Sequence, residues 1–448
     1  TDGIRGMANQ YPMTAEVAFN LGRAVGYYYQ NIKEKTILIG KDTRLSGDML
    51  EEALTAGLCS SGINVIKAGV ITTPAVAYLT KYCKANMGVV ISASHNPYQD
   101  NGIKFFQANG FKLENKQEIE IEDILVREKY KKLHIPGELI GKVVNLKEAK
   151  SIYIKYIINS IPKNLKKLNH RIIIDCANGS AGEIIGELFD HLMINHKIIN
   201  NRPNGFNINQ ECGSTSLNCL QNKVLEEHAD LGFAYDGDAD RVLVVDEKGK
   251  LVDGDQMMVI YANAFIKEGK LGNNKIVATY MSNLGFDKAI SELGGKVIRT
   301  DIGDKFVLRK MLEENALLGG EQSGHIIFLK HSPNGDGIVS TFKLLDAIEH
   351  TGEKVSIQAA RMNKYHQRLL NYRVGINRAD FLQNPQFVLI AEEMQKSFTG
   401  IGRVMIRPSG TERKIRILLE SIDKDIVNEW EQKLNNFFQE INNKLSSR

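Results

Sequence analysis

Short apolar runs typical of buried strands alternate with amphipathic stretches of helical length three times in succession along this chain. The first series contains strand-like runs at residues 36–40, 63–67 and 87–91, and a helical pattern that Thr14 can cap. The same alternation returns in the middle of the chain and again before residue 330. This pattern predicts layered sheets covered by helices, and its recurrence predicts an internal structural repeat without clear residue-level self-similarity.

Length, charge and a late change of pattern divide the chain into four segments. Its 448 residues, 43% of them hydrophobic, can bury several cores, because single domains commonly hold about 100 to 200 residues. Charged residues thicken from Lys112 to Lys150, as is typical of a solvated helical face at a domain edge. After residue 400, two apolar runs around a polar loop and a closing amphipathic helix predict a smaller domain. We therefore expect an α/β fold with three consecutive α/β domains on layered mixed sheets at 1–145, 146–250 and 251–364, and a C-terminal α+β domain at 365–448.

Composition argues against several classes of protein. The 57 basic and 53 acidic residues give a net charge of +4 without the clustered basic stripe of nucleic-acid binding, so anionic small molecules are the expected partners. The five cysteines are odd in number and lack CxxC spacing, which indicates neither a disulfide framework nor a zinc site and favours a reducing cytoplasm. The chain contains no run of about 18 apolar residues and no basic-then-apolar leader, so we expect neither a membrane span nor a signal peptide.

Three aspartates alternate with small residues in the stretch YDGDADR, directly after an apolar run. Asp236, Asp238 and Asp240 can converge on one hard cation, most naturally magnesium, because glycine and alanine leave room between them. An EF-hand loop is a poor alternative, because its twelfth position counted from Asp236 is Lys248 in place of glutamate. An acidic hairpin turn is the other alternative, since Asp-Gly is a common turn dipeptide. The preceding strand and the following Arg241 favour the metal site.

A second polar loop, SASHNP, follows an apolar run and contains Ser94, and strand-end loops commonly carry the chemistry of open α/β sheets. A nucleophilic hydrolase would use His95 as base, but we expect neighbours on an extended loop to point apart, and no GxSxG elbow is present. A phosphoryl group on Ser94 would need a cation close by, which the aspartate loop could bring. Taken alone, the loop would be read as an ordinary Asx-type turn.

Two further loops contain groups that suit a phosphorylated sugar. The stretch RPSGTERKIR offers guanidinium groups, hydroxyls and a glycine, and arginine forks match phosphate oxygens, although an exposed turn with stray basic residues fits equally well. The stretch GGEQSGH presents hydrogen-bonding side chains between glycines, which could contact sugar hydroxyls or an amine. The residues concerned are Arg407, Ser409, Gly410, Thr411 and Arg416 in the first loop, and Glu321, Gln322 and Ser323 in the second.

In their order along the chain, SASHNP with NGIK downstream, DGDADR, GEQSGH and RPSGTE resemble the motifs of the α-D-phosphohexomutase superfamily, from Thr1 to about Leu419. TDGIRG, GKDTRLSG, NINQECGST, LVDGDQ and the glutamine of the third motif are most similar to the bacterial phosphoglucosamine mutases. The resemblance implies four domains around a central cleft. It also implies interconversion of glucosamine 6-phosphate and glucosamine 1-phosphate through a sugar bisphosphate, serving UDP-N-acetylglucosamine and cell-wall precursor synthesis in the cytoplasm.

The resemblance further implies roles for individual residues. Ser94 would be the phosphorylated serine, whose phosphate holds magnesium together with the three aspartates. Glu321 and Ser323 would contact the sugar, and Lys104 would be a candidate general acid or base. The loop that would hold the unreacted phosphate contains Arg407, Ser409, Gly410, Thr411 and Arg416, and the reaction centre would also include Arg5, His95 and Arg241.

Cofactors, partners and rivals follow from the same resemblance. It implies Mg²⁺, glucosamine 1,6-bisphosphate or a similar bisphosphate as activator, a phosphosugar substrate and possibly a homodimer. Arg413 stands where the superfamily usually has proline, which frees the backbone and adds charge beside the phosphate site. The alternatives are a phosphomannomutase or phosphoglucomutase with the same chemistry, a magnesium-dependent sugar phosphatase, and a non-catalytic sugar-phosphate-binding protein.

Overall fold

The computed structural model describes residues 3–446 except 163–164, 166–167, 375–377 and 409–413. It consists of two compact units, and each is described by itself. The first comprises Thr1–Met281 and Leu293–Ala360, and the second comprises Ser282–Glu292 and Arg361–Arg448. Among the described residues, none of the helices combines the length and the apolar composition that a membrane crossing demands.

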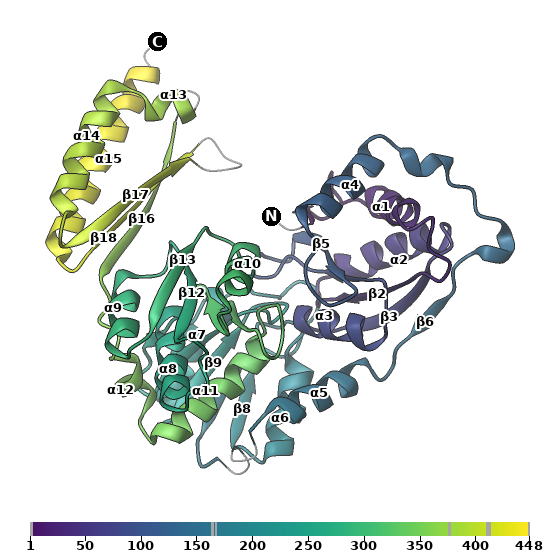
Figure 1. Cartoon of the computed structure of the whole chain (residues 1–448), viewed down its shortest axis with the longest axis horizontal. Helices are drawn as coiled ribbons and strands as arrows, with labels where there is room; N and C mark the ends of the chain where they lie inside the picture. Colours follow the sequence, from purple (N-terminus) through teal and green to yellow (C-terminus); the bar gives the residue numbers. More distant parts are fainter. Residues whose placement is uncertain (1–2, 163–164, 166–167, 375–377, 409–413, 447–448) are drawn as a thin grey trace. The chain divides into compact units, whose positions relative to one another are not determined.

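The first sheet of the first unit has the strand order β1-β5-β4-β2-β3-β6. Strands β2, β3, β4 and β6 are parallel, whereas β5 is antiparallel to both β4 and β1. Helices α1 and α2 cover one face of this sheet and α3 covers the other (Figure 1). The elements are β1 (Ile4–Met7), α1 (Ala15–Tyr28), β2 (Thr36–Lys41), α2 (Ser46–Cys59), β3 (Asn64–Val70), α3 (Thr73–Tyr82), β4 (Met87–Ile91), β5 (Asp100–Gln107), α4 (Asn115–Val126) and β6 (Val143–Asn145).

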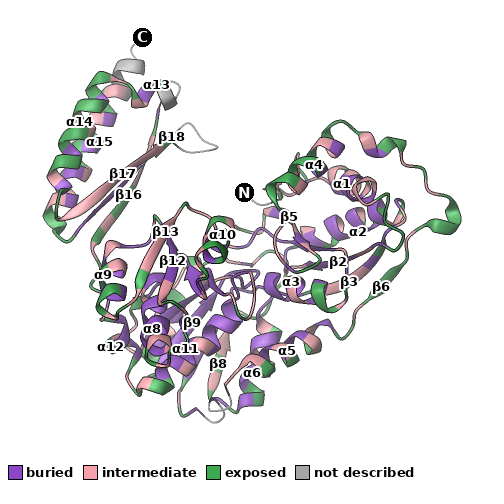
Figure 2. Ribbon diagram, in the orientation of Figure 1, coloured by how far each residue is buried: buried purple, intermediate pink, exposed green. Residues whose placement is uncertain are grey.

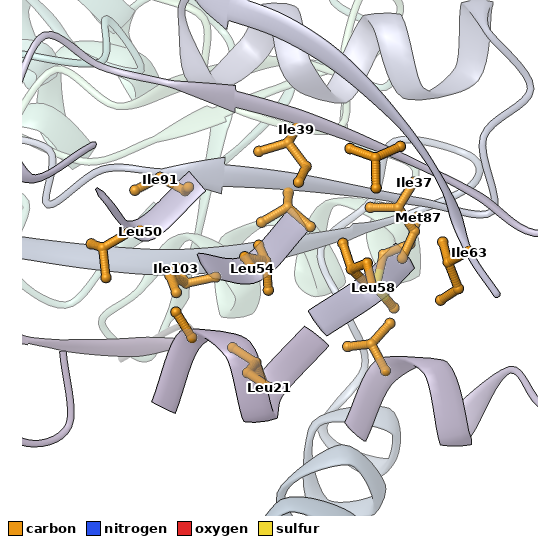
Figure 3. Packing of buried hydrophobic residues seen from close by; sticks show 14 of the residues in the cluster. Leu21, Ile37, Ile39, Leu50, Leu54, Leu58, Ile63, Met87, Ile91 and Ile103 are labelled. Carbon is orange, nitrogen blue, oxygen red and sulfur yellow. The ribbon is translucent and has the colours of Figure 1, made fainter. Parts of the chain in front are cut away.

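The core of this sheet forms because α1 and α2 each present an apolar stripe to the strands. Helix α1 begins after Thr14, whose hydroxyl accepts a hydrogen bond of 3.2 Å from Val17 N, which confirms the predicted cap. Leucines of both helices interdigitate with isoleucines of the strands (Figure 3). The members include Leu21, Leu50, Leu54, Leu58, Ile37, Ile39, Ile91 and Ile103. This packing gives the loop that follows β4 a rigid base.

Two further mixed sheets complete the first unit, with the orders β11-β10-β9-β7-β8 and β13-β12-β14-β15. The elements of the second sheet are α5 (Ala149–Ser160), β7 (Ile172–Asp175), α6 (Gly182–Leu192), β8 (His196–Ile199), α7 (Asn218–Glu226), β9 (Leu231–Tyr235), β10 (Val242–Asp246) and β11 (Leu251–Val252). Those of the third are α8 (Gly254–Lys267), β12 (Lys275–Thr279), β13 (Lys296–Thr300), α10 (Asp304–Glu314), β14 (Leu318–Gly320), β15 (Ile326–Phe328), α11 (Gly337–Thr351) and α12 (Val355–Ala359).

The three sheets share one topology, which confirms the predicted structural repeat. In β3-β2-β4-β5, β8-β7-β9-β10 and β13-β12-β14-β15, two parallel pairings are followed by one antiparallel pairing. The connection within each antiparallel pair is the polar loop that the sequence singled out. One detail differs from the prediction: Gly319 and Gly320 belong to β14, so the loop of the third sheet is shorter than the turn expected at residues 319–325.

The second unit is a smaller α+β structure. Its antiparallel sheet has the order β16-β18-β17, and the buried faces of the two long helices at residues 385–398 and 424–446 meet this sheet (Figure 2). Trp430, Leu434 and Phe438 of the last helix are buried in its core, as the amphipathic pattern predicted. The elements are α9 (Leu284–Glu292), β16 (His366–Arg373), α13 (Arg378–Leu382), α14 (Pro385–Phe398), β17 (Gly402–Pro408), β18 (Lys414–Ser421) and α15 (Lys424–Ser446).

Candidate active site

Ser94 lies in the loop between β4 and β5, against the aspartate loop that joins β9 and β10. Its Oγ donates a hydrogen bond of 2.7 Å to Asp236 Oδ2, and both side chains are buried. Ser94 has a φ of 53°, a left-handed conformation that costs a non-glycine residue about 1–2 kcal/mol. Such strain persists where the surroundings determine the conformation, often at functional sites. The structure therefore brings together the two loops that the sequence placed 142 positions apart.

The geometry around His95 differs from the sequence-based argument. Ser94 is left-handed and not extended, and its Oγ lies 3.4 Å from His95 Nδ1, so the two side chains do not point apart. Arg241 Nη1 lies 3.1 Å from the same nitrogen. Burial and the positive charges of Arg241 and Arg5 lower the pKa of His95 to about 4. The imidazole is therefore neutral near neutral pH.

The three aspartates form a compact group of carboxylates. Ligand atoms of Asp236, Asp238 and Asp240 lie within 4.8 Å of one another, and all three residues are buried. Burial and the neighbouring charges of Asp240 and Asp238 raise the pKa of Asp236 well above its usual value. In the described part of the chain, Asp238 Oδ1 and Asp240 Oδ1 have no hydrogen-bond partner. Buried carboxylate oxygens without partners fit a hard divalent cation such as Mg²⁺.

Two residues contact Asp238, one from helix α3 and one from strand β5. Thr73, the first residue of α3, donates from Oγ1 to Asp238 Oδ2 over 2.7 Å. Lys104 on β5 is buried, and its Nζ forms an ion pair of 3.1 Å with the same oxygen. Gly237 lies between the aspartates, and a Cβ there would stand 2.8 Å from Ser94 O, closer than real Cβ contacts allow. The absence of a side chain at Gly237 therefore permits the close approach of the two loops.

Arg241 and Arg5 bring positive charge to the same centre. The Arg241 backbone N donates to Asp236 Oδ1 over 3.2 Å. Burial disfavours the charged form of Arg241, but the nearby carboxylates of Asp240 and Asp236 raise its pKa. Arg5 lies on β1 opposite Gly102 of β5, so it stands beside the serine loop. The structure thus gathers Ser94, His95, Lys104, Arg241 and Arg5 around the three aspartates.

The loop between β14 and β15 adjoins the aspartate loop. Val242 N, at the start of β10, donates to Gly324 O over 3.2 Å. Glu321 Oε1 accepts a hydrogen bond of 3.2 Å from Gly303 N. Ser323 Oγ is buried, and within the described residues it has no hydrogen-bond partner. The Ser323 hydroxyl therefore keeps an unused donor and acceptor within this loop.

Sequence reasoning missed the role of His325. Its Nδ1 lies 3.6 Å from Asp240 Oδ2, and its Nε2 lies 3.4 Å from Asp304 Oδ2. Asp304 in turn pairs with Lys112 Nζ. Burial disfavours the imidazolium, but the hydrogen bond and charge of Asp240 raise the pKa of His325. The position of this histidine at the end of GEQSGH was the signal that could have indicated it.

In the second unit, the predicted phosphate loop connects β17 and β18. Arg407 and Arg416 lie opposite each other in the register of these strands. Burial and the charge of Arg416 lower the pKa of Arg407. Like charges at opposite positions destabilise a sheet, so the pair suits an anion that binds both. Ser409, Gly410, Thr411 and Arg413 lie outside the described residues.

Family models match the chain in four consecutive parts. Residues 1–132, 151–249 and 253–365 match phosphoglucomutase/phosphomannomutase alpha/beta/alpha domains I, II and III, and residues 366–436 match the C-terminal domain of the same description. The chain belongs to the phosphoglucomutase/phosphomannomutase family. This membership confirms the resemblance to the α-D-phosphohexomutase superfamily and the predicted class of fold.

Curated relatives within the phosphoglucomutase/phosphomannomutase family extend over nearly the whole chain. The phosphoglucosamine mutase of Acetivibrio thermocellus is 47% identical over 431 residues, which are 95% of each chain. The phosphoglucosamine mutase of Carboxydothermus hydrogenoformans is 46% identical over 436 residues, which are 96% of each chain. Both relatives support the closer resemblance to phosphoglucosamine mutases.

Solved structures share the fold. A phosphoglucomutase/phosphomannomutase family protein from Burkholderia thailandensis has a TM-score of 0.79 and 21% identity, with 97% of this chain and 95% of that chain covered. N-acetylphosphoglucosamine mutase from Aspergillus fumigatus, solved with GlcNAc-6P and magnesium, has a TM-score of 0.62 and 19% identity, with 81% and 92% covered.

Proposed function

We propose that this chain is a phosphoglucosamine mutase, an isomerase that interconverts glucosamine 6-phosphate and glucosamine 1-phosphate. The observation that carries the proposal is the hydrogen bond between Ser94 Oγ and Asp236 Oδ2. It joins a strand-end serine to the carboxylates that suit a divalent cation. Relatives named phosphoglucosamine mutase, 43–47% identical over nearly the whole chain, support the choice of sugar.

The reaction consists of two phosphoryl transfers through Ser94. In the first, the bond from phosphorus to Ser94 Oγ breaks and a bond to the free sugar hydroxyl forms, which gives a sugar bisphosphate and unmodified Ser94. The hydroxyl proton ends on Ser94 Oγ. In the second, the other phosphate of the bisphosphate moves to Ser94 Oγ and its sugar oxygen takes up the proton. Such transfers depend mainly on positioning and charge neutralisation.

Asp236, Asp238 and Asp240 would hold Mg²⁺ together with the phosphate on Ser94. The cation would supply neutralisation of charge on the transferred phosphoryl group. Arg241 and Arg5 add fixed positive charge at the same centre. Lys104 is the group proposed to relay the proton, because it is buried beside Asp238 and close to the serine loop. Neutral His95 lies beside Ser94 Oγ, and its Nδ1 accepts a hydrogen bond from Arg241 Nη1.

Glu321 and Ser323 are proposed to contact the sugar, since the unpartnered Ser323 hydroxyl can exchange hydrogen bonds with a ligand. The phosphate that does not react is proposed to bind the loop between β17 and β18, which must accept either end of the bisphosphate. Its proposed residues are Arg407, Ser409, Gly410, Thr411 and Arg416. A sugar bisphosphate such as glucosamine 1,6-bisphosphate is the proposed activator, and a cytoplasmic homodimer is the proposed state.

The test uses wild-type protein and Ser94→Ala. Intact-mass analysis after incubation with a sugar bisphosphate should show a species heavier by one phosphate that maps to Ser94. The Ala variant should lack this species and should lose turnover by more than about 1,000-fold, because the covalent carrier is removed. Turnover of Ser94→Ala at the wild-type rate would overturn the proposal.

A substrate panel separates this function from its rivals. Glucosamine, glucose and mannose 6-phosphates are compared on the same preparation. We expect preference for glucosamine 6-phosphate, and preference for either neutral sugar would favour a phosphoglucomutase or phosphomannomutase. Inorganic phosphate released in proportion to turnover would favour a phosphatase.

A further inference from the structure

Arg44, in the loop between β2 and α2, binds the backbone around the serine loop through both terminal nitrogens of its guanidinium group. Its Nη2 donates to Ser94 O over 2.9 Å and to Asn96 O over 2.8 Å. Its Nη1 donates to Pro97 O and, over 3.1 Å, to Asp100 O. The side chain is fully buried. Four backbone carbonyls of one short loop thus share a single arginine, an arrangement suited to fixing the course of that loop.

Asn209 supplies a second donor to two of these carbonyls. Its Nδ2 donates to Ser94 O over 2.8 Å and to Asn96 O over 2.9 Å. Asn209 belongs to the second segment of the chain, between β8 and α7, whereas Arg44 belongs to the first. A carbonyl oxygen has two lone pairs, and the carbonyl of Ser94 has a donor for each of them.

The amide side of Ser94 is held through the same network. Ser94 N donates to Ser92 Oγ over 2.9 Å, and Ser92 Oγ donates to Asp42 Oδ2 over 2.6 Å. Asp42 Oδ2 also accepts from Arg44 Nε over 2.9 Å. The peptide groups on both sides of Ser94 are therefore tied to one buried ion pair.

We propose that Arg44 and Asn209 are positioning residues for phosphoryl transfer. They hold Ser94 in its left-handed conformation, which directs Oγ toward Asp236. Left-handed backbone is unfavourable for serine and reverts unless contacts impose it. This inference rests on the proposed function.

Arg44 and Asn209 together form a clamp that contacts the serine loop through its backbone carbonyls. Such contacts are compatible with phosphorylation of Ser94, which changes the charge of the side chain alone. A phosphoryl group adds about −1.5 to −2 charge at Ser94 Oγ but leaves the carbonyl and the amide unaltered. The bonds from Arg44 and Asn209 can therefore persist through both halves of the cycle. Neither residue is placed in contact with substrate, so their loss should lower kcat and leave KM nearly unchanged.

The experiment compares Asn209→Ala and Arg44→Lys with wild type, because Arg44→Ala would leave Asp42 buried without its partner. Arg44→Lys keeps a positive charge for Asp42 but lacks the planar fork. We expect kcat to fall about 10-fold to 100-fold in each variant, with KM for glucosamine 6-phosphate within about twofold of wild type. Hydrogen exchange in residues 92–101 should become faster.

The matched control is Asn207→Ala. Within the described part of the chain, the Asn207 side chain donates to Arg202 O and accepts from Asn204 N, both in its own loop, and it makes no hydrogen bond to the serine loop. Wild-type kcat in Asn207→Ala supports the proposal, and an equal loss in the control would assign the effect to general loosening. Wild-type kcat in Asn209→Ala and Arg44→Lys, or a loss carried by KM, would overturn it. Hydrogen exchange reports on the clamp even if the wild-type protein proves to lack mutase activity, so the two proposals fail separately.

Discussion

Thr73 Oγ1 donates a hydrogen bond of 2.7 Å to Asp238 Oδ2, and Thr73 N donates one of 2.9 Å to Asp238 O. The first turn of α3, a helix that packs on the first sheet, thus holds the middle of the aspartate loop, which belongs to the second sheet. Asp238 Oδ2 is occupied by Thr73 and Lys104, which leaves Oδ1 as the oxygen for a cation.

Replacing Thr73 should weaken the use of magnesium. Thr73→Val removes the hydroxyl at nearly constant volume, and we expect the Mg²⁺ concentration for half-maximal activity to rise about 10-fold, because hydrogen bonds to charged groups contribute about 1.5–3 kcal/mol. Thr73→Ser keeps the donor and should behave like wild type. Magnesium titrations of the three proteins measure the effect, and an unchanged requirement in Thr73→Val would contradict it.

Asp236→Asn should remove the response of the protein to magnesium. The variant relieves repulsion among buried carboxylates, so its melting temperature without metal should be no lower than that of wild type. Addition of Mg²⁺ should raise the melting temperature of wild type and leave the variant unchanged. Asp190→Asn, at an exposed site, is the control and should keep the wild-type response. Thermal scans with chelator and with Mg²⁺ give the comparison.

His331 should make the stability of the first unit depend on pH. Burial and the charges of Lys343 and Lys330 lower its pKa to about 4 from the ordinary 6.5. Between these values the unfolded chain binds a proton that the folded chain excludes, so the free energy of unfolding falls as the pH falls. His331→Gln should therefore lose less stability than wild type between about pH 7 and about pH 5. Thermal unfolding followed by circular dichroism tests this, with exposed His134→Gln as control.

The ion pair of Arg403 and Glu420 should stabilise the second unit. Glu420 is fully buried and accepts from Arg403 Nε over 2.6 Å and from Leu284 N over 2.7 Å. Arg403→Met should cost about 3–5 kcal/mol, because it breaks one side of a buried ion pair. Trp430 is the single tryptophan and lies in the core of this unit, so its fluorescence during urea unfolding reports the loss.

A surface pair provides the comparison for that measurement. Arg368 and Glu431 are 3.3 Å apart, and their side chains are 53% and 31% exposed, so Arg368→Met should cost about 0–1 kcal/mol. Equal losses in the two variants would show that burial of Glu420 does not determine the effect.

Periodicity predicted strands β2, β4, β7, β9, β10 and β12 of the three mixed sheets, because they are buried along nearly their whole length and appear in the sequence as apolar runs. Within the same sheets it did not identify the short strands β1, β8, β11, β14 and β15. It missed β16, whose residues alternate between exposed and half-buried positions and include few apolar side chains. It also missed β6, a three-residue edge strand that is exposed throughout. The domain limits near residues 145, 250 and 364 stay predictions.

The same distinction holds for the site. Ser94 and the aspartates could be predicted because each loop directly follows an apolar strand. The positioning roles of Arg44 and Asn209 could not be predicted, because these residues bind backbone carbonyls 50 and 115 positions away. Every residue has a backbone carbonyl, so the residue type at that position does not indicate the contact. His325 was overlooked because its partners come from two other elements.

Lys112, Asp304, His325 and Asp240 form a connected row of polar side chains that come from segments of all three mixed sheets. A chimaera that takes one sheet from a distant relative would combine side chains of two different proteins within this row. Their contacts would then no longer match. Exchange of single segments should therefore be rare among related chains, and the three sheets should be inherited as a set. The second unit would likewise have to be exchanged together with Ser282–Glu292, because Leu284 N donates to the buried Glu420.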